Sequence, residues 1–470
     1  MIHAIRQRIP ISNSVLIRLG MIPGLIVGLI GIGFLSSRIS PELVLIAVAV
    51  PPVVLLALSR LEYSVLAIVL TAAFVRFSLP TGTQSRIAAS LLMTMIFTVL
   101  WVARMLVVDK KLQLKPSRAN IPLLSFILIT LISYIWSNAF RDPLVMVWSS
   151  WPFVQIGALA VMVLLPGAFF LASNCLTDIK WIKWLTAIII AVGILKILGD
   201  YLHLPLGFLQ VRPMFPTWFI CLTYSQVLFN RRISTVLRLL LLAFVGAWIY
   251  RVFFTQLTWL SAWLPTMLAV GVISFWRSRW LLVVLLVVVL VYVGANLDYL
   301  QTAYAREPAE SGVTRLDAYM HNWQVTGKHF LFGVGPAGYA AYYMSYFPGE
   351  AMATHSNYLD VLSQTGIVGL LAFLGFFLAL ALTAWDLLGR TKGRFDFTQA
   401  FGVGASAALL GIVVATGLGD WLLPFVYTQT IAGFDYAVYS WVLLGAMVSL
   451  HRLVTVEAAD RIRRSECYLQ

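Results

Sequence analysis

The sequence predicts an all-α polytopic membrane protein, with about 12–14 transmembrane helices and one large external loop that carries amphipathic helices. Hydrophobic residues make up 60% of the 470 residues and charged residues only 11%, whereas an average soluble domain carries about 25% charged residues. The mean hydropathy is +0.89. Apolar runs long enough to cross a bilayer as helices recur along the chain. These observations exclude a soluble enzyme, a disordered chain and a disulfide-built secreted module.

The candidate spans are apolar runs bounded by polar or charged residues, and each must be helical because lipid leaves no other partner for its backbone. The first run has no small-residue cleavage site after it, so we expect a retained span and not a signal peptide. Fourteen runs qualify, at residues 15–35, 42–58, 63–79, 87–108, 119–136, 153–175, 181–199, 214–230, 236–250, 257–276, 279–297, 357–385, 398–416 and 434–450. Pro51-Pro52 interrupts one of them, so the count also allows twelve.

The net charge of +14 is explained by the loops between these spans. From the fourth span onward, alternate loops hold 18 Lys and Arg on one side and 6 on the other. The richer set comprises Lys110, Lys111, Lys115, Arg118, Lys180, Lys183, Arg231, Arg232, Arg238, Arg277, Arg279, Arg390, Lys392, Arg394, Arg452, Arg461, Arg463 and Arg464. Cytoplasmic loops carry such an excess. Both termini are therefore expected in the cytoplasm, and nucleic acid is not an expected partner.

Three parts of the chain follow from this map. Residues 1–297 would form an N-terminal transmembrane bundle, and residues 298–356 a large periplasmic or extracellular loop. Residues 357–470 would supply the C-terminal transmembrane helices and a cytoplasmic tail. No phosphate-binding G-x-x-x-x-G-K-[ST] motif occurs, so the chain does not look driven by ATP. Three scattered cysteines do not predict a disulfide framework or a zinc site.

The large loop contains an amphipathic segment. Leu316, Tyr319, Met320 and Trp323 follow i, i+3, i+4, i+7 spacing, which predicts a helix lying at the membrane surface. Arg315 would sit in its first turn. An arginine there either binds lipid headgroups or takes part in a site, and the helical pattern alone leaves both open.

A glycine-rich turn and a histidine follow this segment. The run 331–339 reads LFGVGPAGY, whose glycines and proline end a helix and permit close backbone approach. His355 then comes directly before a long apolar run, at the outer mouth of a span that Ser356 or Asn357 could cap.

These residues carry a resemblance. The order T-R with a following Trp, then L-F-G-V-G-P-x-G-Y, then H-S-N-Y-L-D-x-L-x-Q-T-G-I-V-G-L-L within residues 311–371 resembles the O-antigen ligase/polymerase family, the Wzy and WaaL group of bacterial membrane glycosyltransferases. The resemblance implies a multi-pass protein of the bacterial cytoplasmic (inner) membrane. It also implies transfer of a glycan from undecaprenyl pyrophosphate to an acceptor sugar hydroxyl on the outer face. The acceptor would be a lipid-linked repeat unit or lipid A core, and no cofactor or metal is implied.

The resemblance assigns Arg315 to the pyrophosphate and His355 to general base catalysis, and both roles suit the chemistry. Guanidinium donates paired hydrogen bonds to phosphate oxygens. Imidazole, with an ordinary pKa of about 6.5, accepts a proton from a hydroxyl near neutral pH.

Four further residues are predicted to bind substrate: Arg212, Arg251, Asn357 and Tyr319. Arg212 lies in the external loop where relatives carry another essential arginine, although Pro213, Phe215 and Pro216 depart from their pattern. Relatives often have Ser-Arg-Gly near residues 258–265, where this chain reads TWLSAWLP. Arg251, at the outer end of the preceding span, is the expected substitute.

Other functions stay open at this point. The acceptor separates a polymerase, a ligase and a protein-glycosylating oligosaccharyltransferase, and polymerase is favoured narrowly. A multi-span transporter or flippase of lipid-linked oligosaccharide is the alternative, although mid-span charges are scarce and no repeated halves are visible. A metal-dependent glycosyltransferase that uses polyprenyl-phosphate sugars would need converging carboxylates, and the first external loop offers only Glu42.

Overall fold

The computed structural model describes residues 60–76, 78–80, 86–209, 211–212, 214–255, 260–297, 315–348 and 354–467. Contacts between residues divide the chain into two compact units, Met1–Leu61 and Glu62–Gln470. Every described helix and strand belongs to the second unit. The spans predicted at 15–35 and 42–58 lie outside the described residues.

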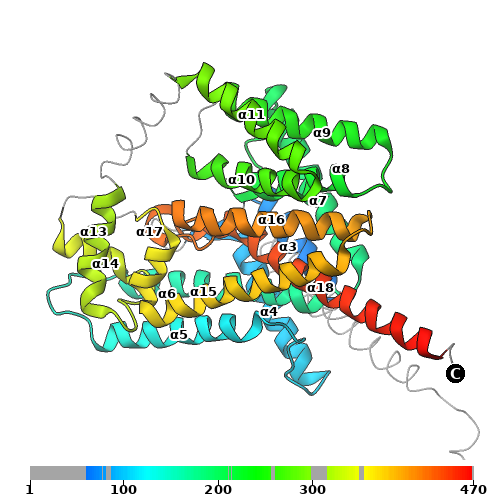
Figure 1. Cartoon of the computed structure of the whole chain (residues 1–470). Coiled ribbons are helices and arrows are strands. Elements are labelled where there is room, and N and C mark those ends of the chain that lie inside the picture. Colours follow the sequence, from blue (N-terminus) through cyan, green and yellow to red (C-terminus); the bar gives the residue numbers. More distant parts are fainter. Residues whose placement is uncertain are drawn as a thin grey trace, which may run out of the picture. The chain divides into compact units, whose positions relative to one another are not determined.

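The described chain is almost entirely helical (Figure 1). Its first half contains α3 (Glu62–Phe74), β1 (Ser78–Pro80), β2 (Arg86–Ala88), α4 (Ala89–Val107), α5 (Asn120–Ala139), α6 (Trp151–Cys175), α7 (Ile179–Tyr201), α8 (Met214–Phe229), α9 (Thr235–Tyr250), the π-helical turn η1 (Arg251–Thr255), α10 (Leu260–Arg277) and α11 (Arg279–Ala295). Its second half contains α13 (Arg315–Thr326), the 3₁₀ turn η2 (Gly327–His329), α14 (Gly338–Tyr346), α15 (Asn357–Thr391), α16 (Phe397–Leu418), α17 (Val426–Gln429), the 3₁₀ turn η3 (Ile431–Gly433) and α18 (Phe434–Cys467).

Eight helices within the described ranges are long and apolar enough to cross a membrane, and α3, α8 and α11 are shorter apolar helices. The predicted all-α polytopic fold is confirmed. One boundary is wrong: the span predicted at 63–79 ends at Phe74. Residues 78–80 instead pair antiparallel with 86–88, with Leu79 opposite Ile87. Pro80 explains the difference, because the residue before a proline avoids the helical region and proline donates no backbone hydrogen bond.

The core is built where long helices pack side by side. α18 packs along α6, α16 along α8 and α10, and α15 along α5. Gly445 of α18 allows close approach to α6, because a Cβ there would lie 2.5 Å from the carbonyl oxygen of Phe169. Aromatic rings fill the space between α15 and α18, where Phe376 stacks on Trp441 with ring centroids 5.5 Å apart. By contrast, α11 has no buried residue, so it lies at the periphery of the bundle.

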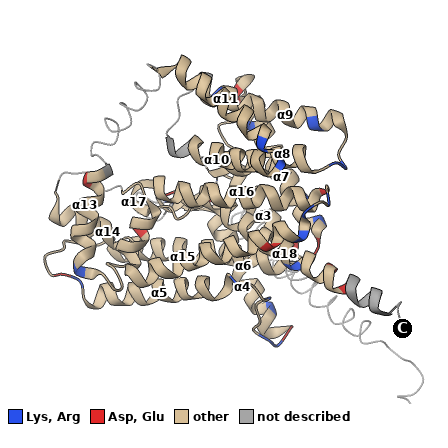
Figure 2. Ribbon diagram, in the orientation of Figure 1, with Lys and Arg blue, Asp and Glu red and all other residues tan. Residues whose placement is uncertain are grey.

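Basic side chains gather at one end of the helices, toward the C-terminus of α18 (Figure 2). We call this the basic end. Loops distant in sequence meet there: the ammonium of Lys115 donates to the carbonyl of Asn174 at 2.5 Å, and the guanidinium of Arg452 donates to the carbonyl of Ser173 at 2.7 Å. Arg394 pairs with Glu457 at 3.0 Å. The loops with the larger predicted share of Lys and Arg therefore share one end of the bundle.

The opposite end carries α13, α14 and α17, and we call it the α14 end (Figure 1). The loop 140–150 is tied to α14, since the backbone N–H of Asp142 donates to the Tyr342 hydroxyl at 3.1 Å. The Tyr346 hydroxyl in turn donates to the Asp142 carboxylate at 2.5 Å. This hydrogen bond from Tyr346 holds the pKa of Asp142 below its usual value.

The span predicted as one helix at 357–385 is broken inside α15. Gly366 has φ 68° and ψ −174°, so the helix interrupts its hydrogen bonding and resumes. The glycine-rich turn fills the gap. The N–H groups of Val334 and Gly335 donate to the carbonyls of Ser363 and Gln364 at 2.8 and 2.9 Å, and the N–H of Ile367 donates to the carbonyl of Phe330 at 2.8 Å. The turn thus supplies the partners that the broken helix lacks.

Replacing Gly366 tests this junction. Gly366→Ala should destabilise the protein by roughly 1–3 kcal/mol, because alanine disfavours positive φ and its Cβ would meet the backbone of Leu331 and Phe332. Thermal unfolding of the purified protein in detergent measures the change. Gly389→Ala is the control, since a Cβ there meets nothing within 4 Å. Equal unfolding temperatures for the two variants would contradict the account.

Candidate functional site

His355 lies at the α14 end, in the turn that leads into α15. Its backbone has φ +50°, a left-handed conformation that few residues other than glycine adopt. Ser356 returns the chain to an extended conformation and is the N-cap residue of α15. The side chain of Ser356 makes no capping hydrogen bond, so the capping predicted for it is absent. The turn must therefore be held by other groups.

Asp360 and Thr354 stabilise the turn by hydrogen bonds. The Thr354 hydroxyl donates to the Asp360 carboxylate at 2.5 Å, and the backbone N–H of Ser356 donates to the same hydroxyl oxygen at 3.3 Å. Asp360 is buried, with a relative exposure of 2%. Asp360 was not predicted from the sequence as a functional residue. An acid in an apolar run five residues after the candidate histidine was the available signal.

Asn357 braces a second loop against the same helix end. Its side-chain oxygen accepts the backbone N–H groups of Leu422 and Leu423, both at 3.0 Å, and its amide nitrogen donates to the carbonyl of Leu423 at 2.6 Å. Asn357 has no exposed surface. These bonds fix loop 419–425 beside His355 and engage both polar atoms of the amide. The predicted substrate-binding role of Asn357 is untested.

Arg315 is the first residue of α13. Its position there does not test either role predicted for its side chain. α13 packs against α14 and α15, so the helix that Arg315 starts lies against the helix that His355 precedes (Figure 1). On α13, the imidazole of His321 stacks on Phe347 with ring centroids 4.2 Å apart and lies 3.1 Å from the Tyr343 hydroxyl. Tyr319 is half-buried on the same helix. Its predicted contact with substrate is untested.

Arg212 lies in the segment before α8 and is exposed. Its guanidinium carbon is 4.7 Å from the centroid of the Tyr436 ring, a cation–π contact that leaves the hydrogen-bond donors of the guanidinium directed to its edges. Tyr436 is in the first turn of α18, which follows directly on η3 and on the loop held by Asn357. Arg212 is therefore connected to the α14 end through α18.

Arg251 is placed differently. It begins η1 and forms an ion pair with Asp200 near the end of α7, and Lys196 pairs with the same carboxylate. Two cations around one carboxylate keep part of their positive charge. The predicted role of Arg251 in place of a missing arginine stays a prediction, and its carboxylate partner was not foreseen because Asp200 is 51 residues earlier in the chain.

A cluster of tyrosines surrounds this end. Tyr339 and Tyr343 of α14 are fully buried, and burial raises the pKa of the Tyr339 hydroxyl. The hydrogen bond to Asp142 raises the pKa of Tyr346 to about 12. Both hydroxyls therefore stay protonated and uncharged near neutral pH. Within the described ranges, no group of three or more His, Cys, Asp or Glu side chains is arranged to hold a metal ion.

The fold and this end of the bundle define the class: an α-helical integral membrane protein with a rigid, histidine-bearing turn at the end of a broken span. Residues 217–374 match the model of the family described as O-antigen ligase (Wzy_C). The resemblance noted in the sequence is therefore confirmed over that segment, which is similar to the O-antigen ligase family. The match contains Arg251, Arg315, Tyr319, His355 and Asn357 and begins after Arg212. No curated protein matches the chain.

The bracing by Asn357 can be separated from a contact with substrate. Asn357→Ala should lower the unfolding temperature and the activity together, because two buried N–H groups lose their acceptor at about 1–3 kcal/mol each. Asn357→Asp keeps an acceptor and should lose less stability. Thermal unfolding and steady-state kinetics measure both effects. Asn296→Ala is the control, since the Asn296 amide bonds within its own helix end. A raised KM with unchanged unfolding temperature would contradict the bracing role.

Proposed function

We propose that the protein transfers a glycan from undecaprenyl pyrophosphate to a sugar hydroxyl at the α14 end. The family match over residues 217–374 supports glycosyltransferase activity of the O-antigen ligase/polymerase type and carries the proposal. The charge asymmetry supports the orientation: the basic end would face the cytoplasm and the α14 end the outer face of the cytoplasmic membrane. The large loop, with residues 298–356, would then be the external part in which donor and acceptor meet.

Arginine would be needed to stabilise the negative charge of the donor's leaving group. A lipid pyrophosphate carries several negative charges, and charge develops on the leaving oxygen as the glycosidic bond breaks. Arg315 would bind these oxygens, with Arg212 as a second ligand approaching from before α8. Fixed guanidinium groups near low-dielectric lipid stabilise such charge more strongly than water does. The packing of α13 against α15 supports this assignment, because it brings the helix that Arg315 begins against the helix that His355 precedes.

The acceptor sets the need for a base. The acceptor hydroxyl attacks the anomeric carbon, the bond from that carbon to the pyrophosphate oxygen breaks, and a new glycosidic bond forms. The hydroxyl proton passes to the imidazole of His355, and undecaprenyl pyrophosphate leaves. The hydrogen bonds from Thr354 and Asn357 around Asp360 support this role, because a general base is effective only when it is held within reach of the proton.

Among the possible acceptors we favour, narrowly, another lipid-linked repeat unit, which would make the protein a polymerase. The glycan profile of a deletion strain separates the classes. Single-repeat glycans would support a polymerase, whereas long chains left on the carrier lipid would identify a ligase that uses lipid A core.

Removing the imidazole tests the base. His355→Ala should reduce glycan transfer by roughly 10²–10⁴-fold, the usual contribution of a general base, while donor binding persists. The assay joins a synthetic lipid-linked donor to an acceptor with purified protein, and native mass spectrometry measures donor binding. His203→Ala is a matched control, because His203 is an exposed histidine that also has positive φ. Unchanged transfer by His355→Ala would leave this histidine with a structural role.

Exchanging one cation for another tests the phosphate ligand. Arg315→Lys keeps the positive charge but loses the paired donors, so transfer should fall by on the order of 10²-fold with normal protein levels in the membrane. Arg141→Lys, at an exposed arginine in loop 140–150, should leave the rate unchanged. Full activity of Arg315→Lys would remove Arg315 from phosphate binding. Movement of labelled lipid across liposomes without formation of glycosidic bonds would instead identify a flippase.

A further inference from the structure

A groove at the basic end lies far from the candidate site and has no role in the proposed reaction. It runs between α7, α8, α9 and the start of α16 and has a volume of about 750 Å³, within the usual range of about 300–1,000 Å³ for pockets that bind small molecules. Its walls are mostly apolar side chains of α7 and α9: Ala187, Ile190, Ala191, Ile194, Leu237 and Leu241.

Cations surround the mouth of the groove. Lys180, Lys183, Arg232 and Arg394 line it together with only two carboxylates, Asp178 and Asp396. Both carboxylates are already engaged as helix caps: Asp178 accepts the N–H of Lys180 at 2.8 Å, and Asp396 accepts the N–H of Thr398 at 3.0 Å.

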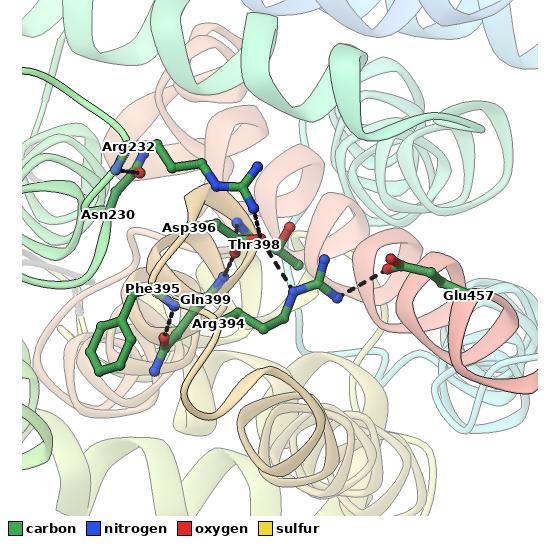
Figure 3. Close-up of polar contacts among 8 residues, drawn as sticks. All are labelled: Asn230, Arg232, Arg394, Phe395, Asp396, Thr398, Gln399 and Glu457. Atoms are coloured by element: carbon green, nitrogen blue, oxygen red, sulfur yellow. Dashed lines mark hydrogen bonds and ion pairs between the residues drawn. The ribbon is translucent and has the colours of Figure 1, made fainter. Parts of the chain in front are cut away.

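Figure 3 shows that Arg232 and Arg394 both point toward Asp396, and Arg394 also pairs with Glu457. Arg232 is only loosely engaged, with 3.8 Å between the charged atoms and a side-chain exposure of 77%. The ammonium of Lys183 lies 5.8 Å from the ring centroid of Phe397, and among the described residues no carboxylate forms an ion pair with it. Lys183 and Arg232 therefore offer positive charge to an anion at the mouth.

A donor without a partner lies deeper. Gln226 lines the groove and has a relative exposure of only 5%. Its side-chain oxygen accepts from Asn230 at 2.8 Å, but its amide nitrogen has no hydrogen-bond partner among the residues that the structure describes. Leaving a buried N–H unpaired is costly, so this donor points to a ligand that carries an acceptor just inside the cationic mouth.

The depth of the groove identifies the ligand's length. Along α7, Lys183 at the mouth and Ile194 at the inner end are separated by about 16 Å at 1.5 Å per residue. That is about half of the roughly 30 Å hydrocarbon core of a bilayer. The groove therefore spans one leaflet, with charge at the headgroup level and apolar walls below it.

We infer that this groove binds one anionic diacyl phospholipid of the leaflet at the basic end. Its phosphate would lie among Lys183, Lys180 and Arg232, and an ester oxygen would accept from Gln226. Its acyl chains would lie against Ala187, Ala191 and their apolar neighbours. Basic pockets between transmembrane helices favour such lipids by charge and by fit. The site stands independently of the proposed glycan transfer, because it shares no residue with the α14 end.

Binding of defined lipids to the purified full-length protein in neutral detergent tests the inference. Dioleoyl-phosphatidylglycerol should bind at least about tenfold more tightly than dioleoyl-phosphatidylcholine, as judged by native mass spectrometry and by the rise in unfolding temperature. The double variant Lys180→Gln/Lys183→Gln should lose about this preference. The double variant Lys110→Gln/Lys111→Gln is the matched control, since it removes the same charge from an exposed loop of the basic end and should keep the preference.

A second pair of substitutions tests the acyl part of the groove. Ala187 and Ala191 are exposed and four residues apart on α7, so Ala187→Phe/Ala191→Phe should fill the groove without disturbing the core and should reduce phosphatidylglycerol binding about tenfold or more. Unfolding temperatures without added lipid should stay unchanged. Equal binding of the two lipids, normal binding to the filled groove, competition by glycerol phosphate alone, or a preference for a polyprenyl phosphate would each overturn the inference.

Discussion

The joint between the glycine-rich turn and the break in α15 determines how the α14 end is built. A span that stops its own hydrogen bonding at Gly366 exposes carbonyl groups, and in an apolar environment these need partners. The turn at 330–335 provides donors and acceptors in the correct order. The hydroxyl of Ser133 on α5 adds donation to the carbonyl of Gln364 at 2.5 Å. Three segments distant in the chain are thereby locked together within the helix that follows His355.

Charge organises the other end. The basic loops bond to carbonyl groups and carboxylates of neighbouring helices, as Lys115 and Arg452 do around the end of α6. Such contacts tie the loops of this end together, and a further group of cations surrounds the mouth of the groove between α7 and α9. The two ends thus use polar groups for different purposes: backbone hydrogen bonds shape the α14 end, whereas long cationic side chains shape the basic end.

The sequence predicted the helices well because apolar length is a local property. It also predicted that the glycines at 333 and 335 permit close approach: Gly333 lies against the backbone of Ser363 and Gln364 in α15, and Gly335 lies against Ser137 of α5. The sequence did not predict contacts between residues that are distant in the chain. The clamp of Asn357 on Leu422 and Leu423 and the pairing of Arg251 with Asp200 join residues more than fifty positions apart. The pairing of Ser78–Pro80 with Arg86–Ala88 was missed because the apolar run was read as helix as far as residue 79.

The sequence predicted which residues form the candidate site and their order along the chain, but not how they are arranged in space. Motif order places His355 at a helix entrance, and the structure adds why that entrance is rigid: a left-handed residue is held by Thr354 and the buried Asp360. The sequence could not show whether the Asn357 side chain binds substrate or stabilises a neighbouring loop, because an amide can make either kind of hydrogen bond.

The clamp made by Asn357 also reaches beyond the segment that matches the ligase family. Leu422 and Leu423 lie past residue 374, where that match ends, and Trp441 of α18 donates to the carbonyl of Leu422 at 2.9 Å. The histidine turn is therefore held in part by the final two long helices. Residues 217–374 therefore lack some of the partners that hold this turn, so they would not retain its arrangement if grafted into another bundle without α16 and α18.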